Sequence, residues 1–532
     1  METKEARPKR QFAVHPLLFA AFPVLYLYVH NIQEGVSTGD LLRTLALVVG
    51  ATGILLAIAT LVLRDQRKAA LAVSALVLLF FSYGHAYLVV KGWRIAGVVV
   101  GRHKVLMSLW LLLVVAAVVL SLRAAKWARE LTTVLNVVAA TLVLINVVGV
   151  FQYQARSHAA ERAAIQESQA GFQGRLPDPA QVRNRPSAIG GQGAHPDIYY
   201  IMLEEYGGER GLSESFDFDN TAFLSRLETR GFYVAHQTTV NYPRTSLSLA
   251  SSLNMEYLDF LTAKVGRDSD DARPLTRLIE YNRVGRFLQS IGYRYVQIGS
   301  WWEPTRVSPI ADQNVIYGGL SEFDRVLYGT TLLRPVREEQ FRRREWKRVQ
   351  FAFNAVAGTK SMRGPKFVFA HILVPHGPYV FYRDGRYKTE DEAGRHKMAD
   401  NYLEQLLYAN SQVERLMDTL LSGPQESRPV IVLQSDEGPF EGSPSYWTRI
   451  LDKNLVRKFP ILNAFYMPGA SHADLYPTIS PVNSFRLVLR LYFGADLAML
   501  PDRNYIFRSI KRLYDFTDVT DRVRGLMSAG DE

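Results

Sequence analysis

The sequence contains no cysteine. Disulfide bonds, thiolate metal ligands and a cysteine nucleophile are therefore excluded. Internal repeats and low-complexity tracts are also lacking in the sequence, so no repeat architecture is indicated. A catalytic site in this chain would have to be built from hydroxyl, carboxylate, imidazole and cationic side chains.

Acidic residues are scarce near the N-terminus, and this scarcity explains most of the positive charge. The formal net charge is +11, and residues 1–152 hold 15 Lys and Arg against 6 Asp and Glu. The remaining residues are close to neutral. Positive charge concentrated in a membrane-like segment reflects membrane topology, so we expect no nucleic-acid partner.

Five apolar runs in residues 1–152 are long enough, or nearly so, to cross a bilayer. They cover residues 15–30, 41–63, 69–90, 105–122 and 131–151. The first is interpreted as a retained helix, because no small-residue cleavage site follows it. The sequence therefore predicts a multi-pass membrane domain of about five spans at residues 1–152.

Basic residues between these runs predict the orientation. Three segments that would face the cytoplasm carry clusters of Lys and Arg, whereas the loop at residues 91–104 opposes the rule. The clusters are Lys4, Arg7, Lys9 and Arg10; Arg64, Arg67 and Lys68; and Arg123, Lys126 and Arg129. An odd number of spans places the rest of the chain outside the cytoplasm, so we expect a protein of the cytoplasmic (inner) membrane with an extracytoplasmic domain.

At 532 residues the chain is too long for one ordinary domain. Residues 153–195 are rich in Ala, Gln, Arg, Gly and Pro and are interpreted as a linker, with one helical stretch at 159–169. From residue 196 onward, strand-like runs alternate with helical patterns, as in an α/β sheet domain. The predicted strands cover 197–203, 231–235, 293–298, 367–372 and 430–434, with an edge strand at 464–467, and the predicted helices cover 223–230, 276–291 and 398–421.

Acidic side chains follow two of the predicted strands at the point where each strand ends. Glu204 and Glu205 follow the strand at 197–203, and Asp436 and Glu437 follow the strand near 430–434. Open α/β sheets keep their chemistry at the carboxyl ends of the strands. Alternation turns only one of Glu204 and Glu205 toward a site, and we choose Glu204 because it directly follows the strand.

Two hydroxyl groups lie at the start of a predicted helix. Thr245 and Ser246 follow Pro243-Arg244 and precede a helical pattern of leucines, where unbonded backbone N–H groups favour an anion. Thr245 could serve only as the N-cap of this helix, and Ser246 could take its place. Carboxylates at two strand ends, together with this threonine, indicate a metal site with a nucleophile.

Four motifs follow one another in a familiar order: Glu204, residues 242–251, Val-Pro-His-Gly-Pro-Tyr at 374–379, and Ser-Asp-Glu-Gly-Pro at 435–439. This set resembles the sulfatase-type branch of the alkaline phosphatase superfamily, over about residues 197–467. With the five preceding apolar runs, the chain looks like the membrane-anchored members, the lipoteichoic acid synthases and phosphoethanolamine transferases. The resemblance implies an α-helical membrane domain followed by a sulfatase-like α/β domain at residues 196–532.

The resemblance also implies a cofactor and a nucleophile. Glu204, Thr245, Asp436 and Glu437 would hold one divalent metal ion, and Thr245 would attack the substrate. A hydroxyl group needs such an ion and a helix N-terminus to become an alkoxide. An all-oxygen ligand set favours Mn²⁺, Mg²⁺ or Ca²⁺ over Zn²⁺. A sulfatase of the formylglycine type is not expected, because the nucleophile position has no Cys/Ser-x-Pro-x-Arg motif.

Three further residues are candidates for substrate contacts. His376 matches a histidine that in the family lies near the leaving group, so it would act as general acid or contact the substrate. Arg244 and Arg306 could bind the ester through their guanidinium groups, although each could also have an ordinary surface role. His371 lies inside a predicted strand, where it could be packed or functional.

Glu437 departs from the family pattern, because most relatives have histidine at this position. Three carboxylates around a divalent ion leave a formal charge of −1, which disfavours both the alkoxide and an anionic substrate. Either nearby arginines offset this charge, or Glu437 lies away from the metal, or catalysis has been lost.

These observations predict a membrane-anchored, metal-dependent phosphotransferase or phosphodiesterase that uses Thr245 on lipid or glycan phosphate esters of the cell envelope. Its expected partners are membrane lipid and this substrate, and the sequence leaves the donor, the acceptor and the oligomeric state open. Two alternatives remain: a hydrolase of phosphate or sulfate esters, and a catalytically silent sulfatase-like protein that binds an envelope component.

Overall fold

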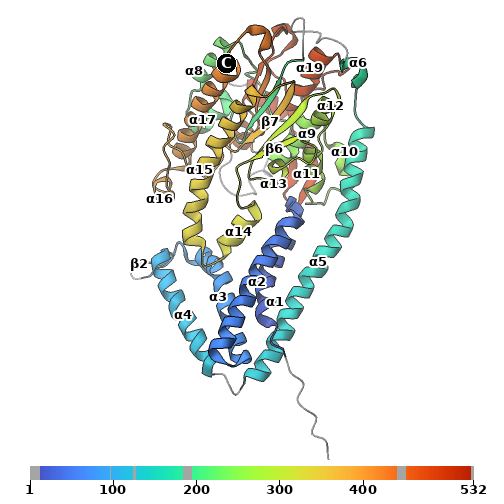
Figure 1. Ribbon diagram of the computed structural model, residues 1–532. Helices are drawn as coiled ribbons and strands as arrows, with labels where there is room; N and C mark the ends of the chain where they lie inside the picture. The colour runs from blue at the N-terminus through green and yellow to red at the C-terminus, as the bar shows by residue number, and fades with distance from the viewer. Residues whose placement is uncertain (1–11, 96–97, 124–126, 184–194, 440–450, 529–532) are drawn as a thin grey trace, which may run out of the picture. The chain divides into compact units, whose positions relative to one another are not determined.

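The computed structural model describes residues 12–95, 98–123, 127–183, 195–439 and 451–528 (Figure 1). Lys4, Arg7, Lys9, Arg10 and Lys126 of the basic pattern lie outside the described residues. The chain separates into two compact units. The first contains residues 1–32, 36–156 and 320–340, and the second contains residues 33–35, 157–319 and 341–532.

Five helices that lie wholly or mostly in the first unit are long and apolar enough to cross a membrane, as the sequence predicted. They are α1 (His15–Asn31), α2 (Thr38–Leu63), α3 (Gln66–Val90), α4 (His103–Arg123) and α5 (Ala128–Ala170). A short 3₁₀ turn, η1 (Ile32–Glu34), follows α1, and strands β1 (Arg94–Ile95) and β2 (Val98–Val99) pair in the loop before α4.

Helix α5 does not end at residue 151, where the last apolar run ends. It continues to Ala170, so the first part of the predicted linker is helical without a break. The added residues are mostly Ala, Gln, Glu and Arg, which are strong helix formers, and the next glycine is Gly171.

A segment far downstream in the sequence also belongs to the first unit. Helix α14 (Glu322–Thr330) packs Phe323 and Leu327 into the same apolar cluster as residues of α1, α2 and α3. Its Asp324 forms an ion pair with Arg43 and accepts a hydrogen bond of 2.9 Å from the Thr44 hydroxyl. The sequence had grouped this segment with the α/β domain, because a nine-residue amphipathic pattern does not reveal its distant partner.

The second unit is built on a seven-stranded mixed sheet in the order β4-β9-β8-β3-β7-β5-β6. Strands β8, β3, β7, β5 and β6 are parallel, and β9 runs antiparallel to both of its neighbours. The strands are β3 (Ile198–Leu203), β4 (Tyr233–Val234), β5 (Arg294–Gly299), β6 (Gln313–Ile316), β7 (Lys366–Ile372), β8 (Val430–Ser435) and β9 (Asn463–Tyr466). The predicted α/β fold is therefore confirmed, although β6 was missed and the predicted edge strand at 464–467 has β4 outside it.

Apolar layers cover both faces of the sheet. The face that carries Tyr200 and Met202 packs against helices α9 (Thr245–Asn254), α11 (Arg273–Glu280), α12 (Arg283–Ser290) and α19 (Pro481–Phe493). The opposite face, with Ile201, packs against α7 (Glu209–Phe216), α8 (Thr221–Thr229), α15 (Arg334–Gly358) and α17 (Met398–Leu420). Each large apolar side chain buried in these layers contributes roughly 1.5–3 kcal/mol.

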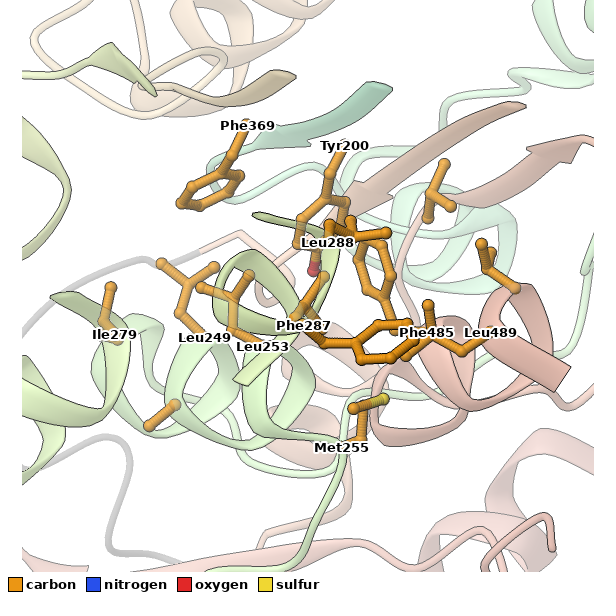
Figure 2. Close-up of a cluster of buried hydrophobic side chains, with 14 of the residues drawn as sticks. Tyr200, Leu249, Leu253, Met255, Ile279, Phe287, Leu288, Phe369, Phe485 and Leu489 are labelled. Atoms are coloured by element: carbon orange, nitrogen blue, oxygen red, sulfur yellow. The ribbon is translucent and has the colours of Figure 1, made fainter. Parts of the chain in front are cut away.

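Figure 2 shows the first of these layers. Tyr200 and Phe369 project from the sheet toward Leu249 and Leu253 of α9, and Phe485 of α19 lies beside them. The ring of Tyr200 stacks on Phe369 at 5.3 Å between centroids and meets Phe485 edge-on at 5.0 Å. This packing fixes α9, the helix whose first residue is Thr245, against the central strand.

The predicted helix at 276–291 is divided in two in the structure. Helix α11 ends at Glu280, and Asn282 caps α12 by accepting a hydrogen bond of 2.7 Å from the Gly285 backbone N–H. An asparagine cap inside a continuous helical pattern starts a new helix, because its side chain bonds the backbone in place of a preceding turn.

The remaining described elements of the second unit are short. They are α6 (Pro179–Arg183), α10 (Asp259–Val265), α13 (Glu303–Arg306), α16 (Glu390–Ala393), α18 (Asp452–Lys458), α20 (Thr520–Ser528), the 3₁₀ turns at Thr359–Ser361, Gln425–Ser427 and His472–Asp474, and the hairpin of β10 (Tyr505–Ser509) and β11 (Arg512–Asp518).

His236 ties α7 and α8 to the loop after β4, and this contact predicts a pH dependence of stability. Its Nδ1 lies 2.6 Å from Glu209 Oε2 and its Nε2 lies 3.0 Å from Glu228 Oε1. The hydrogen bond to Glu209, aided by Glu228, raises the pKa of His236 from 6.5 to about 9. Because the folded pKa lies above the unfolded one, the stabilisation is complete below pH 6.5 and is lost as the pH rises through about 9.

We expect His236→Gln to lower the unfolding temperature below pH 6.5 and to have no effect above the folded-state pKa of about 9. The effect is small, below about 1 kcal/mol, because these side chains are partly exposed to solvent. Thermal unfolding of the wild type and the variant at both pH values measures it, with exposed His396→Gln as the control. A difference that stays constant over this pH range would contradict the assignment.

Candidate active site

Two acids stand side by side at the carboxyl edge of the sheet. In the central strands Leu203 pairs in register with Ile372 on one side and with Ser435 on the other. Glu204 and Asp436 are the next residues of two adjacent parallel strands, which lie roughly 4.8 Å apart. The backbone N–H of Glu205 donates a hydrogen bond of 3.0 Å to Asp436 Oδ1 and joins the two strand ends.

Helix α9 brings Thr245 to this edge. Arg244 is the extended residue before the helix, Thr245 is its first helical residue, and no side chain caps the helix. The interpretation of Thr245 as an N-cap is therefore wrong. Burial raises the pKa of Asp436, and the nearby Thr245 side chain opposes this rise. Ser246, the alternative nucleophile, is buried, and its hydroxyl accepts a hydrogen bond of 3.2 Å from Arg244 Nε.

The Asp436 carboxylate is fully buried, and burial raises its pKa. Its Oδ2 atom has no hydrogen bond of good geometry within the described part of the chain. A buried carboxylate oxygen of this kind calls for a positive ligand, because an uncompensated charge in the interior is costly. Asp436, the adjacent Glu204 and the Thr245 hydroxyl together fit a hard cation that prefers oxygen ligands.

Glu437 is engaged elsewhere. Its Oε2 atom lies 2.8 Å from Lys458 Nζ, and both side chains are nearly inaccessible to solvent. Burial raises the pKa of Glu437, and the adjacent Lys458 ammonium group opposes this rise and favours the carboxylate. Within the described residues, no group of three or more His, Asp and Glu side chains is gathered as metal ligands would be, so Glu204, Asp436 and Glu437 do not form one such set.

His371 lies near the end of β7, and its side chain contacts Glu204. Its Nε2 is 3.5 Å from Glu204 Oε2, and its Nδ1 is 3.0 Å from the Thr305 hydroxyl. Burial lowers the pKa of His371 to about 3, with a further contribution from His376, so the ring is neutral. Trp302 meets this ring edge-on at 5.8 Å. His371 is thus both packed and part of the site, where it contacts the acid at the end of β3.

The loop after β7 places His376 beside the same acid. The His376 backbone N–H donates to the Glu204 carbonyl oxygen at 3.3 Å, and the His376 carbonyl accepts 2.7 Å from Gln405 Nε2. Its half-buried ring is close enough to lower the pKa of His371. The structure therefore brings His376 to the site.

The two predicted arginines have carboxylate partners. Arg244 Nη2 lies 3.0 Å from Glu34, which belongs to the same unit, and Arg306 Nη1 lies 3.2 Å from Glu303. Arg244 is adjacent in sequence to Thr245, and Arg306 follows Thr305, which contacts His371. Both remain predictions as substrate-binding residues.

The backbone at the end of β3 is strained, and several buried side chains hold it. Glu205 has φ of 58°, in the left-handed region that non-glycine residues rarely adopt. The Tyr402 hydroxyl donates 2.9 Å to the Glu205 carbonyl, and the Ser435 hydroxyl accepts 2.9 Å from the Tyr206 N–H. This conformation turns the Glu205 N–H toward Asp436. Strain of this kind is typical of functional sites, where the surrounding contacts maintain it.

The fold and this edge define an α/β sheet protein with a threonine at a helix start and two acids at adjacent strand ends. The chain belongs to the sulfatase family, which matches residues 196–481, more than half of its length. The family indicated by the sequence motifs is thus confirmed. No curated protein matches the chain significantly.

Solved structures with a similar chain path include three from bacterial envelope proteins. The C-terminal periplasmic domain of EptC from Escherichia coli is 14% identical, with 63% of this chain and 96% of that chain covered and a TM-score of 0.41, and this domain has also been solved in complex with Zn. Lipooligosaccharide phosphoethanolamine transferase A from Neisseria meningitidis is 13% identical, with 91% and 96% covered and a TM-score of 0.35. The lipoteichoic acid synthase LtaP from Listeria monocytogenes is 14% identical, with 66% and 94% covered and a TM-score of 0.35. Likenesses at this level carry no argument about activity.

Sequence reasoning missed Lys458, Thr305 and Tyr402, which support the candidate site. Lys458 lies in a short helix 21 residues after Glu437, and no spacing rule connects the two. The only signal for it in the sequence is a lysine directly before the apolar run Phe459-Pro460-Ile461-Leu462, where burial is expected.

Proposed function

We propose that this protein is a membrane-anchored, cation-dependent phosphotransferase or phosphodiesterase with Thr245 as its nucleophile. The observation that carries this proposal is that Thr245, the first residue of α9, lies near the buried Asp436 carboxylate, whose Oδ2 has no hydrogen-bond partner among the described residues. A phosphate ester suits this arrangement, because backbone N–H groups at a helix start attract its anionic oxygens.

Each residue would have a distinct part in the reaction. Thr245 Oγ would form the new bond to phosphorus and lose its proton to solvent water, while the bond from phosphorus to the leaving oxygen breaks. His376 would donate a proton to that leaving oxygen. An acceptor hydroxyl or water would then attack the phosphorus of this threonine ester, and its proton would restore the Thr245 hydroxyl. His371, being neutral, would orient Glu204 without adding charge.

One divalent cation, held by Glu204, Thr245 and Asp436, would lower the pKa of the threonine hydroxyl and neutralise charge on the ester. Oxygen ligands favour Mn²⁺, Mg²⁺ or Ca²⁺ for this role over Zn²⁺. The sequence also predicted Glu437 as a ligand. In the structure the Glu437 carboxylate contacts Lys458 instead.

The membrane helices support a place of action outside the cytoplasm. Five spans with a cytoplasmic N-terminus would put the α/β unit outside the cytoplasmic membrane, where lipid headgroups and surface glycans supply phosphate esters. We propose these esters as the substrate class. Fusion of a periplasmic or cytoplasmic reporter enzyme to the C-terminus tests the orientation, and a cytoplasmic signal would overturn it.

The covalent intermediate provides the direct test. The purified full-length protein in lipid nanodiscs, incubated with Mn²⁺ and phosphatidylethanolamine or phosphatidylglycerol, should carry the phosphoryl group on Thr245 with its remaining ester still attached, as a phosphoethanolamine or phosphoglycerol adduct that peptide mass spectrometry detects. The adduct should be absent from Thr245→Ala and present in Ser246→Ala. The same adduct on Ser246 would show that the serine is the nucleophile and would contradict the proposal. No adduct with either phospholipid would also contradict it and favour the silent sulfatase-like alternative.

A further inference from the structure

The charge at the sheet edge requires a counterion. Glu204, Asp436 and Glu437 around one divalent cation would leave a formal charge of −1, as the sequence already indicated. Lys458 adds one positive charge to this group and brings the total to zero, the value that a histidine in place of Glu437 would give. In the structure the partner of Glu437 is therefore Lys458 and not one of the nearby arginines.

Lys458 is built into the site by contacts on two sides. Its Nζ lies 2.8 Å from Glu437 Oε2 and 3.0 Å from the Gly438 carbonyl oxygen, and the Gly438 N–H donates 2.9 Å to the Lys458 carbonyl. A side chain at Gly438 would meet the Arg457 carbonyl oxygen at 2.1 Å, so only glycine permits this approach. The Asp-Glu-Gly turn and the end of α18 thus fit each other closely.

This contact restrains the Glu437 carboxylate. Lys458 and Glu437 are 3% and 4% exposed, so water screens their attraction little. A divalent cation bound to the same oxygen would lie beside the ammonium group, and the two positive charges would repel each other strongly in this interior. Glu437 Oε2 can therefore pair with Lys458 or bind the cation, but not both at once.

We propose that Lys458 is a positioning residue that holds the Glu437 carboxylate in an ion pair outside the coordination of the cation. Glu204, Thr245 and Asp436 are then the protein ligands. This inference rests on the proposed cation-dependent function and adds to it the reason why an acid at position 437 is compatible with a cation site.

The test measures Mn²⁺ affinity and not turnover. The full-length, metal-stripped protein in nanodiscs is titrated with Mn²⁺ by calorimetry for the wild type, Asp436→Asn, Lys458→Met, Lys458→Arg and the double variant Glu437→Gln/Lys458→Met. Asp436→Asn should weaken binding more than about tenfold. The double variant removes the whole ion pair without changing the net charge, so its affinity should equal that of the wild type. Lys458→Arg keeps the charge and should also bind normally.

Lys458→Met alone releases an uncompensated carboxylate beside the cation and should bind Mn²⁺ more tightly. A purely structural role of Lys458 predicts no such gain. If Lys458→Met does not fold, the double variant decides the question, because a buried ion pair can often be replaced by neutral groups. A double variant that binds as weakly as Asp436→Asn would show that Glu437 is a ligand and overturn the inference alone. A wild type that binds no Mn²⁺ would overturn the cation-dependent function itself, and this inference with it.

Discussion

Replacing Thr245 with alanine is expected to abolish turnover, by about 10⁴-fold or more, while the protein still folds. The Thr245 hydroxyl is the nucleophile in the proposed reaction, and no neighbouring group replaces it, since the Ser246 side chain is buried and bonded to Arg244. The methyl group of Thr245 is half-buried and contributes little to the core, so the unfolding temperature should change only slightly.

Two matched variants make this result specific. Thr245→Ser keeps a hydroxyl group at the start of α9 and should retain part of the activity, whereas Ser246→Ala should leave turnover nearly unchanged. Release of headgroup or transfer to an acceptor lipid is measured with radiolabelled phospholipid in nanodiscs. If Thr245→Ala keeps more than about a hundredth of the wild-type rate, the threonine is not the nucleophile.

The acids and the threonine could be found from the sequence because short-range patterns locate them. Glu204 and Asp436 each follow a run that is typical of a buried parallel strand, and parallel strands end on the same edge of a sheet. Thr245 precedes a run of leucines with helical spacing, and the helix begins at that residue. Local patterns therefore placed these three residues at one edge of the sheet, and the sulfatase family confirms the fold. Their role as a metal site stays a prediction.

Other features depend on contacts between distant segments, which leave no periodic signal. Strand β6 has four residues at the edge of the sheet, and only pairing with β5 makes it a strand. Helix α14 joins the membrane unit through the contact of Asp324 with Arg43 and Thr44, about 280 residues away. Lys458, the partner of Glu437, was missed for the same reason. The sequence showed that an acid at position 437 adds a negative charge to the site, but it did not show which residue balances that charge.

Arg486 gives the second large expected effect, because it is a buried cation that holds three separate segments. Its guanidinium group, 1% exposed, donates to the carbonyl oxygens of Met255, Ala498 and Gln173 at 2.8 to 2.9 Å. Burial lowers the pKa of Arg486 to about 10, with a further contribution from Arg283, so the group stays charged at neutral pH. Met255 ends α9, the helix that begins at Thr245.

Arg486→Met should therefore destabilise the α/β unit by about 3–5 kcal/mol, since three buried carbonyl groups lose their donors at once. Arg486→Lys should recover only part of this loss, because one ammonium group cannot reach three acceptors that a planar guanidinium spans. Arg490, one turn further along α19 and partly exposed, provides the control, and Arg490→Met should change stability by less than about 0.5 kcal/mol. Urea unfolding of the full chain, followed by tryptophan fluorescence, compares the variants. Equal midpoints for Arg486→Met and Arg490→Met would mean that water replaces the lost donors, and that Arg486 does not hold the end of α9 in place.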